Sequence, residues 1–409
     1  MRGIRGNFLA IRGKIKEPLA LKFLNTPFTP KTLITEALLR ASTCSLLVLL
    51  GLIWGPSLEL VAKTIEPAYQ DPFDLAAGGA SLTRASKEGV LFANPALMRL
   101  TSGFIRWIGS SSNLLVNKES VDTARKFLPG GSGQSSSASA TSNTEIVDLI
   151  LKNPLRIGWG QAVSLITRSF GGSFFSRFEV DFAASQYGAA GLPEVSVKTE
   201  SYNGFVLGAP IPVPIPWVYF GLTGKYLFAS EESVTADVAD QSQITKYSDP
   251  NTLKSLYSQN SGAGVDAAAL LFLQGSAMDF TLALKADDVG NTNLTGDSLS
   301  PKTLKQVNSV GTGLTLHTGD DMIHFAVDYR DVGNVYGEPL FKRIYAGTKI
   351  TVRQMVGVAA GFYNGYPSMG AVVDLFFFRL ALTSYTRELG DHPGVAPRHM
   401  YLASISAGF

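Results

Sequence analysis

The sequence predicts an all-β protein: a transmembrane antiparallel β-barrel of about 14 strands, with an N-terminal segment folded into its lumen as a plug. Three observations support this prediction. Successive segments of roughly nine to eleven residues alternate between apolar and polar positions. The connections between these segments are alternately short and long. The sequence also ends on such a segment, which needs a neighbouring strand to hold it.

The last segment, residues 399–409, is the reference from which the other strands are counted. Tyr401 and Ile405 fall on one face, and Ser404 and Ser406 fall on the other. We expect this strand to close the barrel against the first one. Its ending resembles the closing strand of bacterial outer-membrane barrels, which finishes in Phe with another aromatic residue eight positions earlier. Tyr401 and Phe409 match those positions, and the resemblance implies a signal read by the barrel-assembly machinery.

Thirteen further strands are predicted upstream by the same alternation. Residues 278–286, for example, set Phe280 and Leu282 against Asp279 and Thr281. The full prediction is 100–108, 155–169, 174–184, 194–206, 218–228, 262–273, 278–286, 309–317, 321–330, 343–353, 355–363, 369–375, 378–387 and 399–409. An even number of strands places both ends of the barrel chain on one side of the membrane.

The connections sort by length. Every second one is short, with the proline-rich 207–217 somewhat longer: 170–173, 207–217, 274–277, 318–320, 354 and 376–377. The others are long, with 364–368 as the exception: 109–154, 185–193, 229–261, 287–308, 331–342 and 388–398. A soluble protein of two β-sandwich domains is the alternative, because its strands also alternate. It does not predict this sorting of loops.

Composition excludes several classes of function. Charged residues make up only 17% of the chain. Residues 1–62 hold eight Lys or Arg and three Glu, so the remainder carries 27 basic and 30 acidic residues and gives nucleic-acid binding no support. The single cysteine, Cys44, allows neither a disulfide framework nor a cysteine metal site, and we predict no cofactor. No Gly-x-Ser-x-Gly motif lies near a histidine, so we predict no enzyme.

An apolar run at residues 45–54 predicts export. Its ten residues suit the core of a signal peptide and fall short of the roughly 20 that a membrane-spanning helix needs. We expect an export signal over residues 1–62, cleaved after Ala62 or at Ser57. The segment before the run is long for a signal peptide, which leaves two possibilities open: an extended presequence, or a start codon nearer residue 31. An uncleaved anchor is the rival interpretation.

Two motifs follow the export signal. Small residues surround Gly78 and Gly79, and Asn94-Pro95-Ala96 comes about fifteen residues later. This pattern is similar to the N-terminal plug of the FadL-like family, which comprises long-chain fatty acid transporters and PorV-like proteins. The family commonly has small or polar residues just before Asn-Pro-Ala. This chain departs from the pattern there, with Lys87 and Glu88.

The C-terminal quarter strengthens the resemblance. Residues 361–367 read Gly-Phe-Tyr-Asn-Gly-Tyr-Pro, and residues 384–394 contain Tyr, Glu-Leu-Gly and Pro-Gly in the order of the last FadL-like hairpins. Ser368 stands where Thr is usual. The resemblance covers residues 71–409 loosely.

The resemblance implies an organisation and a location. Residues 1–62 would be the export signal, 63–99 the plug, and 100–409 the barrel, with long external loops at 109–154, 229–261 and 287–308. The protein would lie in the outer membrane of a Gram-negative-type bacterium, in contact with outer-membrane lipid. Its function would be passive uptake of hydrophobic small molecules such as long-chain fatty acids. The alternative is a PorV-like barrel that acts without transport, as a scaffold or shuttle for protein partners.

A fatty-acid-like ligand would need a cation to pair with its carboxylate. The strand pattern predicts six lumen-facing candidates: Arg177, Lys225, Lys285, Arg343, Lys349 and Arg353. Acidic residues occupy the same face, namely Glu179, Asp181, Asp279 and Asp328. The mixed signs also fit an interior network of salt bridges with no ligand role, and both interpretations stay open at this point.

Overall fold

The structure is a computed structural model, and all that follows concerns the compact unit Leu58–Phe409. It describes residues 69–87, 89–100, 104–127, 154–185, 194–237, 259–296, 302–388, 393–394 and 396–408. The predicted export signal, Cys44 and Phe409 lie outside these ranges. Over the described ranges, no helix is both long enough and apolar enough to cross a membrane.

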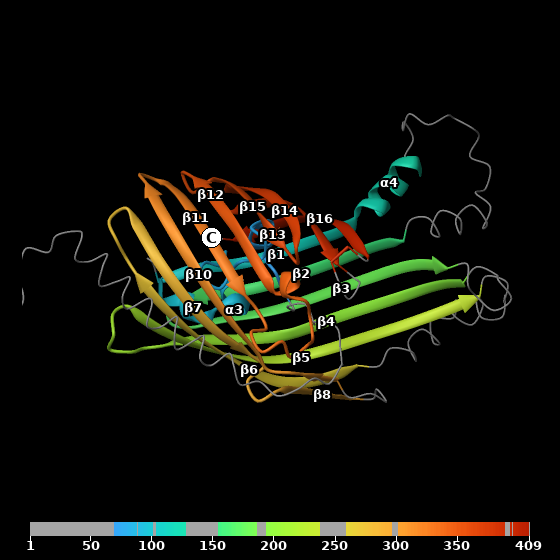
Figure 1. The fold of residues 1–409 in the computed structure, drawn as a ribbon, viewed down its shortest axis with the longest axis horizontal. Coiled ribbons are helices and arrows are strands. Elements are labelled where there is room, and N and C mark those ends of the chain that lie inside the picture. The colour runs from blue at the N-terminus through green and yellow to red at the C-terminus, as the bar shows by residue number, and fades with distance from the viewer. Residues whose placement is uncertain are drawn as a thin grey trace, which may run out of the picture. The chain divides into compact units, whose positions relative to one another are not determined.

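In the described part of the chain, fourteen antiparallel strands form a closed ring (Figure 1). They are β1 (Ile105–Asn117), β2 (Leu155–Thr167), β3 (Gly171–Ser185), β4 (Glu194–Ile211), β5 (Val218–Asp237), β6 (Asn260–Leu273), β7 (Met278–Asp287), β10 (Val307–Thr318), β11 (Asp321–Tyr329), β12 (Ile344–Val352), β13 (Val356–Tyr363), β14 (Tyr366–Leu375), β15 (Phe378–Glu388) and β16 (Pro397–Gly408). Each pairs with the next along the chain, and β16 pairs with β1. The predicted 14-stranded barrel is therefore confirmed.

The closing seam joins β1 to β16 in a single register. Gly109 lies opposite Gly408, and pairing continues to Asn117 opposite Met400. Trp107, only 2% exposed, covers the two glycines, since a Cβ on either would lie 2.8 Å from its ring. The last strand therefore closes the barrel as expected.

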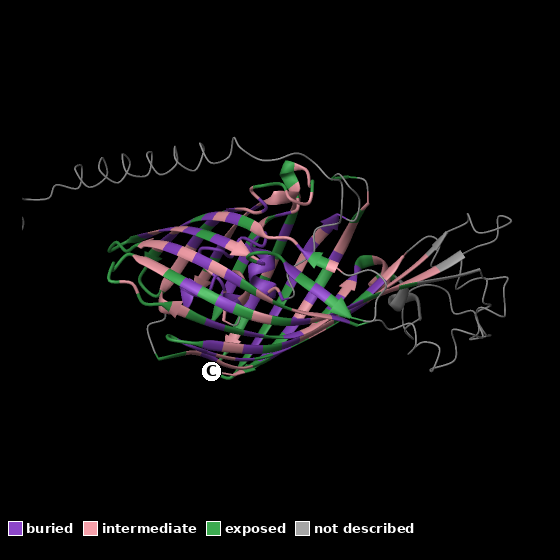
Figure 2. Cartoon of the chain, turned by 90° about the horizontal axis from the view of Figure 1, so that it is seen from below, coloured by how far each residue is buried: buried purple, intermediate pink, exposed green. Residues whose placement is uncertain are grey.

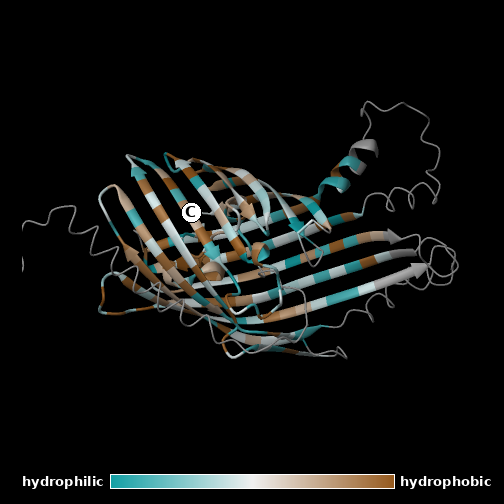
Figure 3. Ribbon diagram, in the orientation of Figure 1, coloured by the Kyte–Doolittle hydropathy of each residue, from teal (hydrophilic) through white to brown (hydrophobic). Residues whose placement is uncertain are grey.

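Side chains alternate between the two faces of the wall, as Figures 2 and 3 show by their stripes. Large apolar residues are exposed on the outer face, among them Val163, Leu207, Phe325, Phe362, Leu382 and Ile405. Buried polar residues occupy the inner face, among them Ser111, Thr223, His324, Asp328, Lys349 and Arg379. An apolar outside around a polar inside is the arrangement that a barrel needs in lipid.

Several strands extend further than predicted. β1 continues to Asn117 and β5 to Asp237, so both enter ranges expected to be loops. In residues 229–237 the sequence is mostly polar and acidic, and it lacks the apolar alternation by which the other strands were identified. Backbone pairing extends them nonetheless, because β4 and β5 stay in register from Ile211↔Phe220 to Glu194↔Asp237.

The two ends of the barrel differ, as the loop lengths predicted. At the short-turn end the connections are 168–170, 212–217, 274–277, 319–320, 353–355 and 376–377. At the long-loop end the connection 364–365 is tight. Within the described residues, three of the longer connections hold α4 (Lys118–Phe127), β8 (Thr292–Gly296) with β9 (Lys302–Leu304), and α8 (Leu340–Arg343). The hairpin β8–β9 prolongs β7 and β10, and β8 pairs with β6.

Candidate functional site

Residues 69–100, here called the inner segment, lie against the inner face of the wall (Figures 1 and 2). They contain α2 (Pro72–Ala76), α3 (Gly89–Ala93) and the 3-10 helix η2 (Pro95–Leu100). We call residues 69–87 the first arm and residues 89–100 the second arm. Asp71 begins α2, because its carboxylate accepts hydrogen bonds from the backbone N–H groups of Phe73 and Asp74, and Pro72 suits the first helical position.

The first arm is attached to β11, β12, β14 and β15 by buried polar bonds. The centre is an ion pair between Asp74 and Lys349, whose Nζ lies 2.6 Å from the Asp74 carboxylate; both side chains are at most 7% exposed. Lys349 also donates to the Arg84 carbonyl at 2.9 Å, and Ser86 Oγ donates to Asp74 at 2.6 Å. Burial lowers the pKa of the Arg84 guanidinium from its usual value, against the opposing effect of Asp279 and Asp74.

A second group of bonds fixes the end of the first arm to β11. The Asp328 carboxylate accepts from the backbone N–H groups of Ser81 and Leu82 at 2.7 and 3.0 Å. Arg330 donates to the Gly79 carbonyl at 2.5 Å. Because Asp328 is fully buried, these bonds compensate for much of its lost hydration.

Gly78 and Gly79 form the bend after α2, with φ of +70° and +74°, where glycine has no steric penalty. Gly78 also lies directly on the backbone of β13, since a Cβ there would come within 2.7 Å of Phe362 N. Its N–H donates to Ser368 Oγ at 3.0 Å, and that hydroxyl donates to the Ala76 carbonyl. Ser368 thus retains the hydroxyl that the more usual Thr would supply.

The second arm is attached mainly by apolar packing. Val90, Leu91, Ala96 and Met98 are completely buried, in a cluster with residues of β1–β6 that include Ile166, Phe175, Val206 and Leu270. Gly221 of β5 leaves room for the start of η2, since a Cβ there would lie 2.5 Å from Ala96 N. Side chains of the wall also donate to three carbonyls of this arm: Lys285 to Phe92, Thr223 to Leu91 and Arg106 to Leu97.

Asn94 joins the two arms. Its side chain is fully buried; Nδ2 donates to the Leu82 carbonyl at 2.8 Å, and Oδ1 accepts from Ala96 N–H at 3.0 Å. Pro95 then starts η2. The predicted plug residues therefore have separate tasks: Gly78 and Gly79 make the bend of the first arm, and Asn94, Pro95 and Ala96 link and seat the second.

Four of the six predicted lumen cations lie on the inner face, each beside an acidic group. The pairs are Arg177 with Glu179, Lys225 with Asp266 and Asp288, Lys285 with Asp287, and Lys349 with Asp74. The structure places the other two elsewhere. Arg343 lies beside Tyr329 at the long-loop end and donates to its hydroxyl at 2.8 Å and to the Asp331 carbonyl. Arg353 is exposed in a turn at the short-turn end.

A larger ionic network covers the inner face of β2–β4 and β15–β16. Arg156, 2% exposed, pairs with Glu179 and Asp181. Arg387 lies 3.5 Å from Glu179, and Arg398 pairs with Asp181. The network accounts for Glu179 and Asp181, two acidic residues that the strand pattern placed on the lumen face. Arg156, Arg387 and Arg398 were not predicted as site residues.

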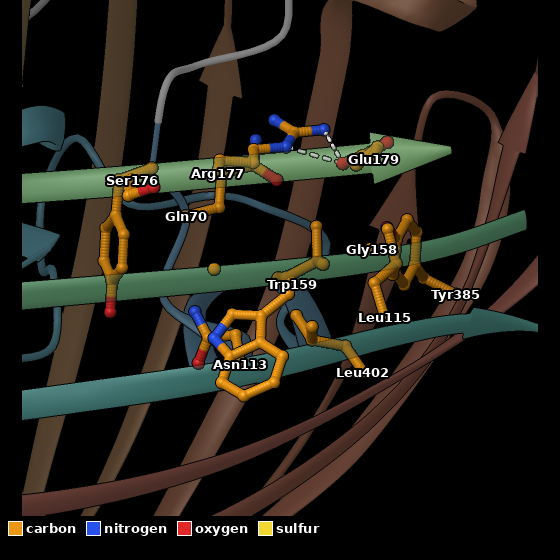
Figure 4. Close-up of a pocket in the computed structure, with 13 residues that line it drawn as sticks. Gln70, Asn113, Leu115, Gly158, Trp159, Ser176, Arg177, Glu179, Tyr385 and Leu402 are labelled. Carbon is orange, nitrogen blue, oxygen red and sulfur yellow. Dashed lines mark hydrogen bonds and ion pairs between the residues drawn. The ribbon is translucent and has the colours of Figure 1, made fainter. Parts of the chain in front are cut away.

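The described residues leave a small cavity between the inner segment and the wall, with a volume of about 60 Å³ (Figure 4). It is lined by Tyr69 and Leu75 of the first arm, by Asn113 and Leu115 of β1, and by Arg177 and Tyr385. Roughly 150 Å³ is needed for a benzene ring. The cavity therefore has room for a few water molecules but not for a benzene ring.

The two C-terminal sequence strings meet at the long-loop end. The Glu388 carboxylate accepts from Tyr366 Oη at 2.5 Å and from the N–H groups of Gly394 and Ala396 at 2.7 Å each. Glu388 is 6% exposed. Its carboxylate therefore joins the start of β14 to the last long loop. This contact explains why Tyr366 of the first string and Glu388 and Gly394 of the second occur together.

No protein-family model and no curated protein matches the chain. Among solved structures, it is similar to the Ralstonia pickettii toluene transporter TbuX, with 10% identity over 84% of this chain and 98% of that chain and a TM-score of 0.46. The Pseudomonas putida toluene transporter TodX has 9% identity over 84% of this chain and 98% of that chain, with a TM-score of 0.40. The translocator domain of autotransporter NalP from Neisseria meningitidis has 10% identity over 76% of this chain and 91% of that chain, with a TM-score of 0.34. Such values identify neither a family nor a substrate, and the fold rests on the strand pairing itself.

Proposed function

We propose that this chain is a FadL-like barrel of the outer membrane that admits hydrophobic small molecules, with the inner segment as a movable plug. The observation that supports the proposal is a segment of the same chain that packs against the inner face of the wall. That segment is held by hydrogen bonds, ion pairs and packing, all of which can be broken and remade. The cavity beside the segment, with a volume of about 60 Å³, is too small for a benzene ring, and we expect passage of a solute to require movement of the segment.

The charges of the lumen favour uncharged solutes over fatty acids. The four inner-face cations among the predicted candidates each have an acidic partner within 2.9 Å. A carboxylate that bound one of them would have to compete with a protein carboxylate already in place. Long-chain fatty acids are one class of solute that the proposal includes. The ion pairs favour a second class, uncharged alcohols or hydrocarbons of similar length.

The test compares two solutes that differ only in their head group. Intact cells of a Gram-negative host, with and without the protein, are given radiolabelled 1-decanol or decanoate, and initial uptake rates are measured. We expect the protein to raise decanol uptake more than decanoate uptake. An equal rise for both would support fatty-acid carriage. No rise for either would contradict transport and leave the PorV-like scaffold as the function to pursue.

We also propose that the chain end directs insertion by the barrel-assembly machinery. Tyr401 is partly exposed on the outer face of β16, opposite Val116 and Ser384. Deletion of Phe409 should block assembly in cells, measured as loss of the heat-modifiable form in the outer-membrane fraction. Normal assembly of the truncated chain would contradict this role.

A further inference from the structure

We propose that the turn between β14 and β15 is a lipid anchor, which inserts Phe376 and Phe377 into the membrane interface at the short-turn end. Phe376 is 93% exposed and Phe377 is 64% exposed. Leu375 and Phe378, the residues on either side, are each about half exposed. Four consecutive apolar residues at the tip of a hairpin are unfavourable in water.

The backbone shows that these aromatic residues are not what the turn itself requires. Leu375 pairs with Phe378, so the loop has two residues, and Phe376 has φ of +47°. A bulky residue is uncommon in this left-handed region, and Gly is preferred at the first position of a two-residue turn in which only that residue has positive φ. The chain uses Gly319, with φ of +65°, at this position of the two-residue turn between β10 and β11. Phe376-Phe377 therefore replaces the sequence that would serve the backbone best.

Connections at the short-turn end differ in character: Phe170 and Trp217 are also about half exposed there, whereas two connections are polar. The two-residue turn between β10 and β11, also at the short-turn end, is Gly319-Asp320. The connection at 274–277 reads Gln-Gly-Ser-Ala. Next to the proposed anchor, Met355 is 47% exposed, and its carbonyl accepts from Asp374 N–H at 2.7 Å. Met355 thus enlarges the apolar patch formed by residues 375–378.

Lipid is the occupant that the surroundings indicate. Strands β14 and β15 have 10 and 11 residues, and a tilted strand needs roughly 9–11 to cross the hydrocarbon core. Their ends therefore lie at its boundary. The patch is continuous with the exposed apolar wall, through Val373 on β14 and Leu380 on β15. Aromatic rings are favoured at this depth, where apolar tails meet head groups.

The inference is tested by measuring the depth of the turn in a bilayer. The full chain with Cys44→Ser has no other cysteine. Phe376→Cys is then introduced and labelled with a nitroxide, and the protein is reconstituted in vesicles of dioleoyl phosphatidylcholine. Electron paramagnetic resonance compares collisions with oxygen, which concentrates in lipid, with collisions with a water-soluble nickel chelate. Leu382→Cys on the outer wall is the lipid control, and Asp320→Cys is the water control.

We expect the label at 376 to collide with the nickel chelate several-fold less than the label at 320, with oxygen collisions close to those at 382. Nickel accessibility equal to that at 320 would overturn the proposal. Heat modifiability on gels verifies folding of each variant. If Phe376→Cys does not fold, Phe377→Cys replaces it with the same two outcomes. The experiment does not depend on what passes through the barrel.

Discussion

Both arms of the inner segment have buried apolar side chains against the wall, including Phe73, Leu75 and Ala76 of the first arm, but the arms differ in their polar bonds. The first arm is attached through individual bonds with defined directions, such as Asp74 to Lys349 and Asp328 to two backbone N–H groups. The second arm is attached mainly through completely buried apolar side chains such as Leu91 and Met98. A polar bond can be replaced by a hydrogen bond to water independently of its neighbours. The stabilisation of an apolar cluster instead depends on the total apolar area that it buries. We therefore expect loss of a charge partner to loosen the first arm, and a change of packing volume to loosen the second.

The largest effect should come from Lys349→Met. This change leaves the Asp74 carboxylate buried without its cation, and breaking a buried pair from one side costs about 3–5 kcal/mol. Urea unfolding of the purified protein in detergent measures the loss. Because the first arm should also loosen, its amides should exchange faster with deuterium than those of residues 89–100.

The double variant Asp74→Asn/Lys349→Met is the control, because it removes both charges. It should recover part of the stability lost in Lys349→Met. Arg353→Ala should have almost no effect, since Arg353 is exposed in a turn. If Lys349→Met were as stable as the unchanged protein, the ion pair would not be what holds the first arm.

The second arm should respond to volume instead of charge. Gly221→Ala puts a methyl group 2.5 Å from Ala96 N, and overpacking of this kind costs about 1–3 kcal/mol. Gly224→Ala is the matched control, because it lies on the same strand with nothing within 4 Å of its Cβ position. Equal unfolding midpoints for the two variants would show that η2 is not seated on Gly221.

The barrel could be predicted from sequence because one physical rule repeats along it. Each wall strand must place apolar residues toward lipid and polar residues inward, so a period of two appears fourteen times. The rule fails where a strand leaves the lipid. Residues 229–237 pair with β4 but have no apolar face, and they were expected to be a loop.

The attachments of the inner segment could be predicted only in part. The glycines and Asn94 stand out as turn and capping residues, and the strand pattern places Lys349 on the inner face. Their partners do not stand out, because Asp74 and Lys349 are separated by 275 positions and no local pattern joins them. Asp71-Pro72 does carry a helix-start signal, Asp at the N-cap and Pro at the first position, which could have located α2.

The connection between the arms should be sensitive to Asn94. Asn94→Ala leaves the buried Leu82 carbonyl and the Ala96 N–H without their side-chain partner, at a cost of about 1–3 kcal/mol. Asn94→Asp keeps an acceptor for Ala96, loses the donor to Leu82 and buries a carboxylate, so its cost is an upper limit for the Leu82 bond. Unfolding in urea gives both values. An unchanged midpoint for Asn94→Ala would mean that the arms are attached to the wall independently.

The smallest effect should come from Lys87→Met, at the end of the first arm. Lys87 pairs with Asp374 at 2.9 Å, but the two side chains are 24% and 31% exposed. Water competes for such a pair, so its loss should cost at most about 1 kcal/mol. Its contact with the Trp107 ring, at 4.2 Å, is partly retained because the methionine thioether also packs on aromatic rings. If Lys87→Met lost as much free energy of unfolding as Lys349→Met, the partly exposed pair would hold the first arm as strongly as the buried pair, which would contradict this prediction.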